Sequence, residues 1–153
     1  MTLILSEYAN EKIDLLKTIS MILIHDIVEI DAGDTYAYDE ERKKTQKSRE
    51  LAAADRIFAM LPEDQQQKFR QLWEEFESAE TPEAKFARAM DNVQPIMLNS
   101  ATNGKSWEER GIRLSQILKR NQITPEGAEK LWDYMQENFI KPNVENGKII
   151  KDI

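Results

Sequence analysis

The sequence contains no cysteine, which excludes disulfide bonds and zinc sites built from thiolates and is consistent with a reducing compartment. Only five glycines and five prolines occur in 153 residues, which argues against a loop-rich or all-β fold. The longest nearly continuous apolar run, Ile19–Ile24, is far too short to span a bilayer. The first residues lack the basic start of a secretory signal. We therefore expect a cytoplasmic protein with no membrane partner.

Positive charge is also scarce, since 21 Lys and Arg face 28 Asp and Glu and the formal net charge at pH 7 is -7. This balance disfavours a nucleic-acid polymer as partner, because affinity for the phosphate backbone rests on Lys and Arg. It leaves open a small nucleotide held beside a metal ion. With 41% hydrophobic residues, the chain is long enough for one domain with its own core.

The stretch Ile19–Thr35, read ISMILIHDIVEIDAGDT, combines apolar residues with residues that carry chemistry. Its first part is almost wholly apolar, yet it contains the only histidine of the sequence, His25, and two acids, Asp26 and Glu29. Ionisable groups in an apolar helix are costly unless they are paired or bind a metal. The pattern therefore indicates a functional site.

We expect this stretch to form a buried helix that begins at residue 10 or 11 and ends near residue 31, with Gly33 as a left-handed stop. At about 100° per residue, His25 and Glu29 would share one face and Asp26 would point to the side. From His25 to Glu40 the sequence holds six Asp or Glu and no Lys or Arg. Such an acidic pocket favours a bound cation.

The rest of the chain predicts further helices and no strand. Apolar spacing, caps and prolines predict helices over residues 48–61, 62–78, 82–99, 106–118 and 124–141. Residues 36–47 are polar and predict a surface loop, or alternatively a lid that meets substrate phosphate. Residues 143–153 predict a loose tail. We expect an all-α helical bundle that forms a single domain over residues 1–153.

Asp91 lies away from the apolar stripe of its predicted helix, on a side that it shares with Ala87 and Leu98. Two interpretations follow from the residues alone. Asp91 is either a solvent-facing or capping acid, or it belongs to a second buried face of the helix.

The segment LIHDIVEIDAGDT resembles the second motif of the HD-domain metal-dependent phosphohydrolases, and within them the branch of bacterial 5'-deoxynucleotidases and their eukaryotic relatives. The segments AAADRIFAMLPEDQ and FARAMDNVQPIMLN fit the same branch. The resemblance runs from residue 1 to about residue 143. It implies an HD-domain helical bundle, a bound divalent metal ion and a homodimer.

The resemblance also implies roles for particular residues. His25, Asp26 and Asp91 would be metal ligands, Glu29 would be the general acid or base, and the substrate would contact Asp34 and Thr35. Imidazole with carboxylates suits Co, Mn, Zn, Fe or Ni better than Mg. In the family a further His ligand lies on an N-terminal segment that would precede Met1, and we expect this sequence to lack it.

The resemblance therefore implies hydrolysis of (deoxy)nucleoside 5'-monophosphates with release of phosphate. Two alternatives remain open at this point. One is a catalytically impaired HD-domain module with a dimerisation or nucleotide-binding regulatory role, which the missing His favours. The other is a purely structural acidic bundle.

Overall fold

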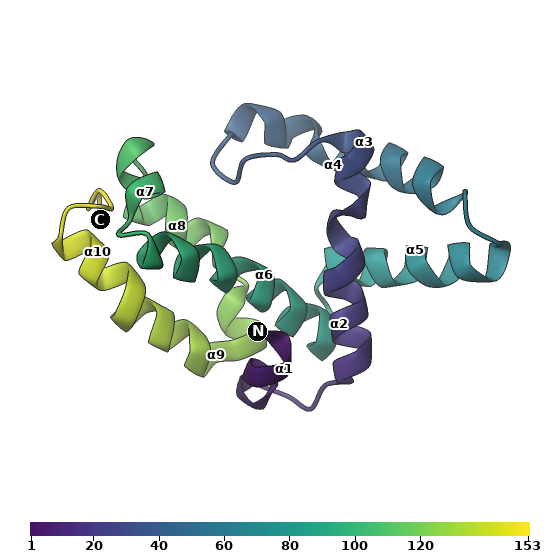
Figure 1. Ribbon diagram of the computed structural model, residues 1–153, viewed down its shortest axis with the longest axis horizontal. Helices are drawn as coiled ribbons and strands as arrows, with labels where there is room; N and C mark the ends of the chain where they lie inside the picture. Colours follow the sequence, from purple (N-terminus) through teal and green to yellow (C-terminus); the bar gives the residue numbers. More distant parts are fainter.

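Helix α6 (Pro82–Ala101) packs against helices from both the N-terminal and the C-terminal parts of the chain in the computed structural model, which describes residues 1–153 (Figure 1). Its start follows the predicted pattern of cap, proline and acid, because the Thr81 hydroxyl accepts a hydrogen bond from the Ala84 amide at 3.3 Å. It packs along α9 (Thr124–Met135) and against α2 (Leu15–Ile24) and α5 (Glu63–Ser78). No β-strand is present, so the predicted all-α class is confirmed.

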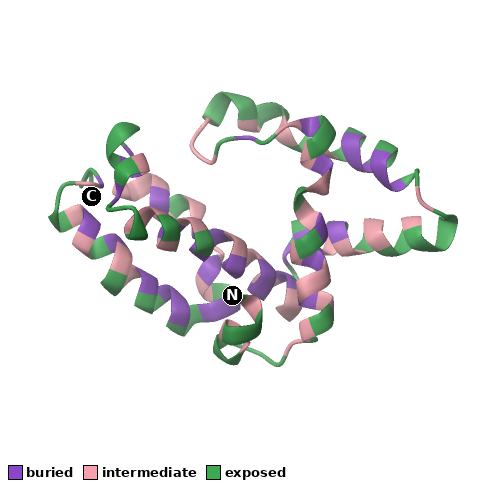
Figure 2. Cartoon of the chain, viewed as in Figure 1, coloured by how far each residue is buried: buried purple, intermediate pink, exposed green.

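The apolar core is divided into two large clusters with a small one between them (Figure 2). The larger cluster joins α6 and α9 to the chain's C-terminal segments. The second joins α3 (Glu29–Ala32), α4 (Glu40–Phe58) and α5 to the end of α2. Four buried residues of α2, α5 and α6 connect them: Met21, Phe76, Ala84 and Ala87. The functional stretch therefore lies at the junction of two packed units.

The predicted helix over residues 10–31 is wrong in its start and in its continuity. Asn10 instead caps α9, since its side chain donates to the Pro125 carbonyl at 2.7 Å and accepts from the Glu129 amide at 2.9 Å. The Asp14 side chain caps α2. At His25 the helix tightens into a 3-10 turn, η2 (His25–Val28), before α3. Gly33 ends α3 with the expected positive φ, +74°, although its ψ of 141° is extended.

Residues 40–47 are helical rather than part of a loop. Asp39 accepts a hydrogen bond from the Arg42 amide at 3.0 Å, and acids fill the first turn of α4, where the helix dipole favours negative charge. This half of α4 is polar all round and carries ion pairs between turns, so it lacks the apolar periodicity by which a helix is recognised.

The C-terminal segments differ from the prediction in two places. The helix expected over residues 106–118 is two helices, α7 (Lys105–Glu109) and α8 (Leu114–Arg120), separated at Gly111 with φ +58°. Residues 143–153 are not a loose tail. The helix of α9 passes through a π-helical turn (Gln136–Ile140) into α10 (Lys141–Glu145), beyond the predicted stop at Pro142.

The segment after α10 is held by specific contacts. Ile149 is 1% exposed in the larger cluster, and the backbone of Ile150 bonds to Ile112 and Leu114. The Asp152 carboxylate accepts from the amide and the hydroxyl of Ser115 at 3.0 and 2.6 Å, which caps the start of α8. These partners are distant in sequence, and local composition therefore does not reveal them.

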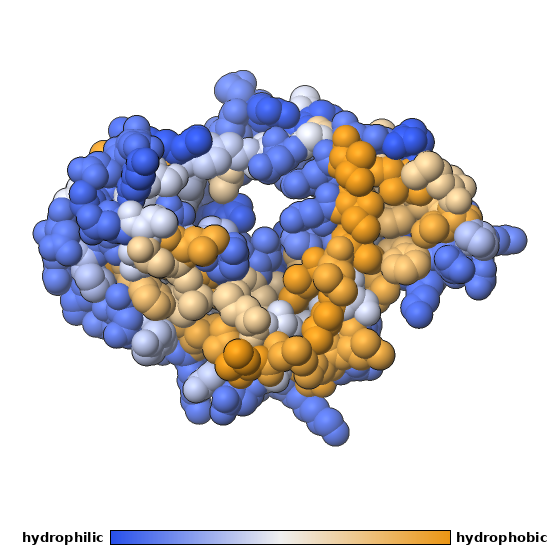
Figure 3. Space-filling model, in the orientation of Figure 1, coloured by the Kyte–Doolittle hydropathy of each residue, from blue (hydrophilic) through white to orange (hydrophobic).

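Large apolar side chains are exposed along α2 and α3 and on α1 (Thr2–Leu5) (Figure 3). They are Leu3, Ile4, Leu16, Leu23 and Ile30, each at least 67% exposed. The homodimer expected from the sequence stays a prediction. None of the helices combines the length and apolar character needed to cross a membrane.

Replacing Gly127 by alanine is expected to destabilise the fold strongly. A Cβ atom at this position would lie 2.2 Å from the backbone carbonyl oxygen of Lys85, where α9 crosses α6. Because backbone cannot rotate away, we expect a loss of about 3 kcal/mol in the free energy of unfolding, measured by urea denaturation. Gly147→Ala is the control, since a Cβ there meets nothing and only the φ of +73° costs about 1 kcal/mol. Equal losses in the two variants would contradict the close crossing.

Candidate metal centre

The 3-10 turn fixes the orientation of the His25 ring. Its Nδ1 lies 2.8 Å from the Ile22 carbonyl oxygen and donates a hydrogen bond to it. This bond assigns the proton of a neutral ring to Nδ1 and leaves the lone pair on Nε2. Phe76 of α5 packs against the ring with a centroid distance of 4.4 Å. The ring is thereby held in one orientation, in which Nε2 is the nitrogen that is free to bind a cation.

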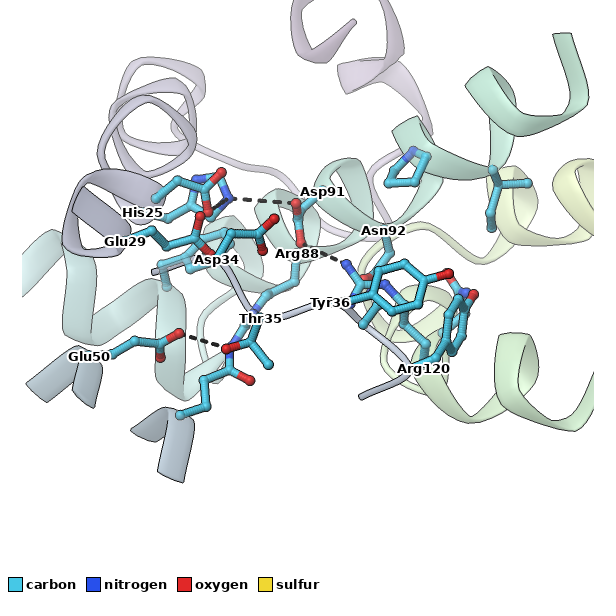
Figure 4. Close-up of a pocket in the computed structure, with 18 of the residues that line it drawn as sticks. His25, Glu29, Asp34, Thr35, Tyr36, Glu50, Arg88, Asp91, Asn92 and Arg120 are labelled. Atoms are coloured by element: carbon cyan, nitrogen blue, oxygen red, sulfur yellow. Dashed lines mark hydrogen bonds and ion pairs between the residues drawn. The ribbon is translucent and has the colours of Figure 1, made fainter. Parts of the chain in front are cut away.

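Two carboxylates face that nitrogen (Figure 4). Asp26 Oδ1 lies 2.9 Å and Asp91 Oδ1 lies 3.6 Å from His25 Nε2. Nε2 is buried and makes no hydrogen bond of good geometry. The structure thus brings together the three predicted ligands, two from η2 and one from α6. Asp26 does not point to the side, because the tighter turn places it beside the imidazole of the preceding residue.

The electrostatics of this cluster favour a positive charge at Nε2. Burial opposes protonation of His25, but the two carboxylates outweigh it and raise the pKa of His25 to about 10. Burial likewise opposes ionisation of Asp91, yet His25, followed by Arg120 and Arg88, holds the pKa of that carboxyl below its usual value. In the metal-free protein a proton occupies the position at which a cation would bind.

The donor set fits a divalent transition metal. One imidazole nitrogen and two carboxylate oxygens are ligands for Mn, Fe, Co, Ni or Zn. Ligands that bind one ion at about 2.0–2.2 Å lie roughly 3 to 3.5 Å from each other, which is close to the separations observed here. The side chains do not form a closed cage of three ligands as they stand, so binding requires them to adjust.

A cavity of about 370 Å³ opens beside the cluster and is large enough for a small nucleotide. Its lining includes the other predicted site residues, Glu29, Asp34 and Thr35. Burial raises the pKa of Glu29 to about 7, with further contributions from the carboxylates of Asp26, Asp34 and Glu50. At neutral pH Glu29 is therefore close to half protonated, as a residue that exchanges protons requires.

The hydroxyl of Thr35 already has a partner within the protein. Arg49 Nη2 donates to it at 2.7 Å, and Thr35 is 9% exposed. This contact holds the segment after Gly33 against α4. Asp34, in contrast, is exposed at the cavity wall. Of the two residues predicted to contact substrate, Asp34 is the more accessible.

Several cavity residues were missed by the sequence reasoning. Arg88 precedes Asp91 by one helical turn, so the spacing could have revealed that it shares a face with Asp91. Arg120, Tyr36 and Asn92 also line the cavity. Arg120 comes from α8, and no local pattern links that helix to the HD motif.

An all-α bundle with one imidazole and two carboxylates gathered between helices has the donor types that suit a divalent metal ion. The protein-family model of the HD domain matches residues 1–132 of this chain. The chain therefore belongs to the HD-domain family, and the predicted HD-domain fold is confirmed.

Similar curated proteins agree with this assignment. The 5'-deoxynucleotidase HDDC2 of Mus musculus is 32% identical over 101 residues, covering 66% of this chain and 50% of that protein. HDDC2 of Xenopus laevis is 31% identical over 108 residues, covering 71% and 53%. The chain spans about half the length of the curated relatives it matches.

A solved structure provides a further comparison. The predicted metal-dependent phosphohydrolase from Magnetospirillum magnetotacticum superposes with a TM-score of 0.90 at 38% identity, over 97% of this chain and 74% of that one. The resemblance to the 5'-deoxynucleotidase-like branch that the motif indicated is thus confirmed.

Proposed function

We propose that this chain carries a metal-dependent phosphohydrolase site that releases phosphate from (deoxy)nucleoside 5'-monophosphates. The observation that supports it best is the convergence of His25 Nε2 with the carboxylates of Asp26 and Asp91 at the edge of a nucleotide-sized cavity. The similar proteins named 5'-deoxynucleotidase support the choice of substrate.

Each predicted site residue has a separate role in the proposed reaction. His25, Asp26 and Asp91 would hold a divalent cation, which supplies Lewis-acid polarisation of a phosphate oxygen when bound. Glu29 takes a proton from the attacking water as its oxygen bonds to phosphorus. The ester bond to the 5' oxygen then breaks, and Glu29 returns the proton to the leaving oxygen, which becomes the free hydroxyl. Asp34 accepts a hydrogen bond from a sugar hydroxyl.

The test uses purified protein that has been stripped with a chelator and resupplied with Co or Mn. We expect phosphate release from deoxynucleoside monophosphates only after metal is returned, measured by a colorimetric phosphate assay. Binding of the metal is followed separately by calorimetry. Turnover that persists in the chelated protein would contradict the proposed role of the cluster, and so would absence of any metal binding.

A second candidate is the catalytically impaired module with a dimerisation or nucleotide-binding role, which the open arrangement of the three predicted ligands favours. One imidazole and two carboxylates leave much of a metal ion's coordination to water. This candidate predicts binding of metal and nucleotide without phosphate release, an outcome that the same two measurements distinguish from the enzyme.

A further inference from the structure

The cavity beside His25, Asp26 and Asp91 is rich in negative charge, which opposes binding of an anionic substrate. Its lining carries six carboxylates, those of Asp26, Glu29, Asp34, Glu50, Glu77 and Asp91. A nucleotide phosphate would be repelled by these groups unless cations compensate for them. Besides the predicted metal, the cavity offers two cations, the guanidinium groups of Arg88 and Arg120.

Arg88 is occupied by contacts within the protein. Its Nη2 lies 3.1 Å from Glu77 Oε2, and its guanidinium stacks on Phe76 at 4.6 Å from the ring centroid. Phe76 in turn supports the His25 ring. Arg88 is thereby part of the wall behind the imidazole, and its charge is largely matched by Glu77.

Arg120 is different, because its guanidinium makes no hydrogen bond to the protein although its side chain is only 31% exposed. The nearest anion is Asp91, whose Oδ2 lies 3.9 Å from Arg120 Nη2. Figure 4 shows that the lines to His25 and to Arg120 leave the Asp91 carboxylate from different oxygens. The guanidinium therefore lies next to the predicted metal position with its donors available.

A buried polar network lies next to Arg120 and ties the end of α8 to α6. Asn92 Nδ2 donates to Thr124 Oγ1 at 3.2 Å, Thr124 donates to Asn121 Oδ1 at 3.3 Å, and Asn121 Nδ2 donates to the Ile117 carbonyl at 2.9 Å. Each of the three polar residues is at most 7% exposed. Because Asn92 follows Asp91 and Asn121 follows Arg120, the network fixes the two site residues relative to each other.

We propose that Arg120 binds the phosphate of the substrate beside the metal, as an anion-binding residue supplied by α8. The inference rests on the proposed function for the identity of the anion. The planar fork of an arginine matches two phosphate oxygens, and the low exposure of the site strengthens charge-assisted hydrogen bonds. The neighbouring network fixes the backbone position from which the Arg120 side chain extends.

The test measures binding of inorganic phosphate to the metal-loaded protein by calorimetry, in parallel with KM for a deoxynucleoside monophosphate. Arg120→Gln is expected to weaken phosphate binding by roughly ten- to a hundredfold and to raise KM by the same factor, because two charge-assisted hydrogen bonds are lost. Arg120→Lys keeps the charge without the fork and should lie between this variant and the wild type. Metal affinity should change little in either variant.

Lys119→Gln is the matched control, since it removes a positive charge one residue away, at an exposed side chain that does not line the cavity. Equal effects of Arg120→Gln and Lys119→Gln would overturn the inference, as would a wild-type protein that binds no phosphate. If the wild type binds phosphate through Arg120 but releases none from nucleotides, the proposed function fails and the binding role stands.

Discussion

Replacing Asp91 by asparagine is expected to abolish phosphate release while the helical fold persists. The amide keeps the size of the carboxylate but removes the charge that faces His25 Nε2 at 3.6 Å. Loss of residues that merely orient metal ligands typically lowers metal affinity about 10- to 100-fold. Loss of a charged ligand should therefore lower metal affinity at least about 100-fold. The measurement is a Co titration followed by calorimetry, with circular dichroism to verify the helical content.

The control for this variant is Asp133→Asn, which removes an exposed acid from α9 outside the cavity. It should leave metal affinity and turnover unchanged. If Asp91→Asn binds Co as tightly as Asp133→Asn, the metal does not bind at the His25 cluster, and the acids of the cavity serve another purpose.

The sequence predicted the identity of the clustered residues better than their geometry. His25 and Asp26 were recognised through their motif, but a regular helix would have placed Asp26 to the side of the His25 ring. The 3-10 turn that brings Asp26 Oδ1 to 2.9 Å from Nε2 arises where α2 meets α3 at the packing junction. Tertiary packing overrides the regular period there, and no local pattern encodes it.

Other parts of the site were hidden because they depend on contacts between distant segments. The end of the chain has a polar, glycine-containing composition that predicted a loose tail, yet Ile149 is buried and Asp152 caps α8. The same α8 ends at Arg120 in the cavity. Periodicity and caps describe single helices well, whereas the position of α8 is set by its contacts with the C-terminal segment and by Ile117 in the larger core cluster.

Replacing Glu29 by glutamine is expected to lower kcat by roughly 10²- to 10⁴-fold, the range for loss of a general acid or base. The carboxylate cannot accept a proton from water once it has become an amide. Metal affinity should fall much less than in the Asp91 variant, because Glu29 is not one of the predicted ligands. Glu80→Gln, an exposed acid between α5 and α6, is the control and should keep the wild-type rate.

The pH dependence gives this prediction a second, independent readout. Since burial and then the neighbouring carboxylates raise the pKa of Glu29 to about 7, the wild-type rate should rise as the pH passes through the neutral range and the base loses its proton. A bound cation would move this rise in rate to lower pH. The residual activity of Glu29→Gln should not rise with pH in this range. A variant whose rate still rises would show that another group is the base.

Stability should respond in the opposite direction to activity. A carboxyl whose pKa is raised from 4.5 in the folded protein contributes stability that is present below pH 4.5 and is lost as the pH rises through about 7. Above pH 7 the ionised Glu29 therefore weakens the metal-free fold, and glutamine removes that cost. We expect metal-free Glu29→Gln to melt at a higher temperature than the wild type at pH 8, with a smaller difference at pH 4. A higher melting temperature with lost turnover is the pattern expected of a residue retained for chemistry at the expense of stability.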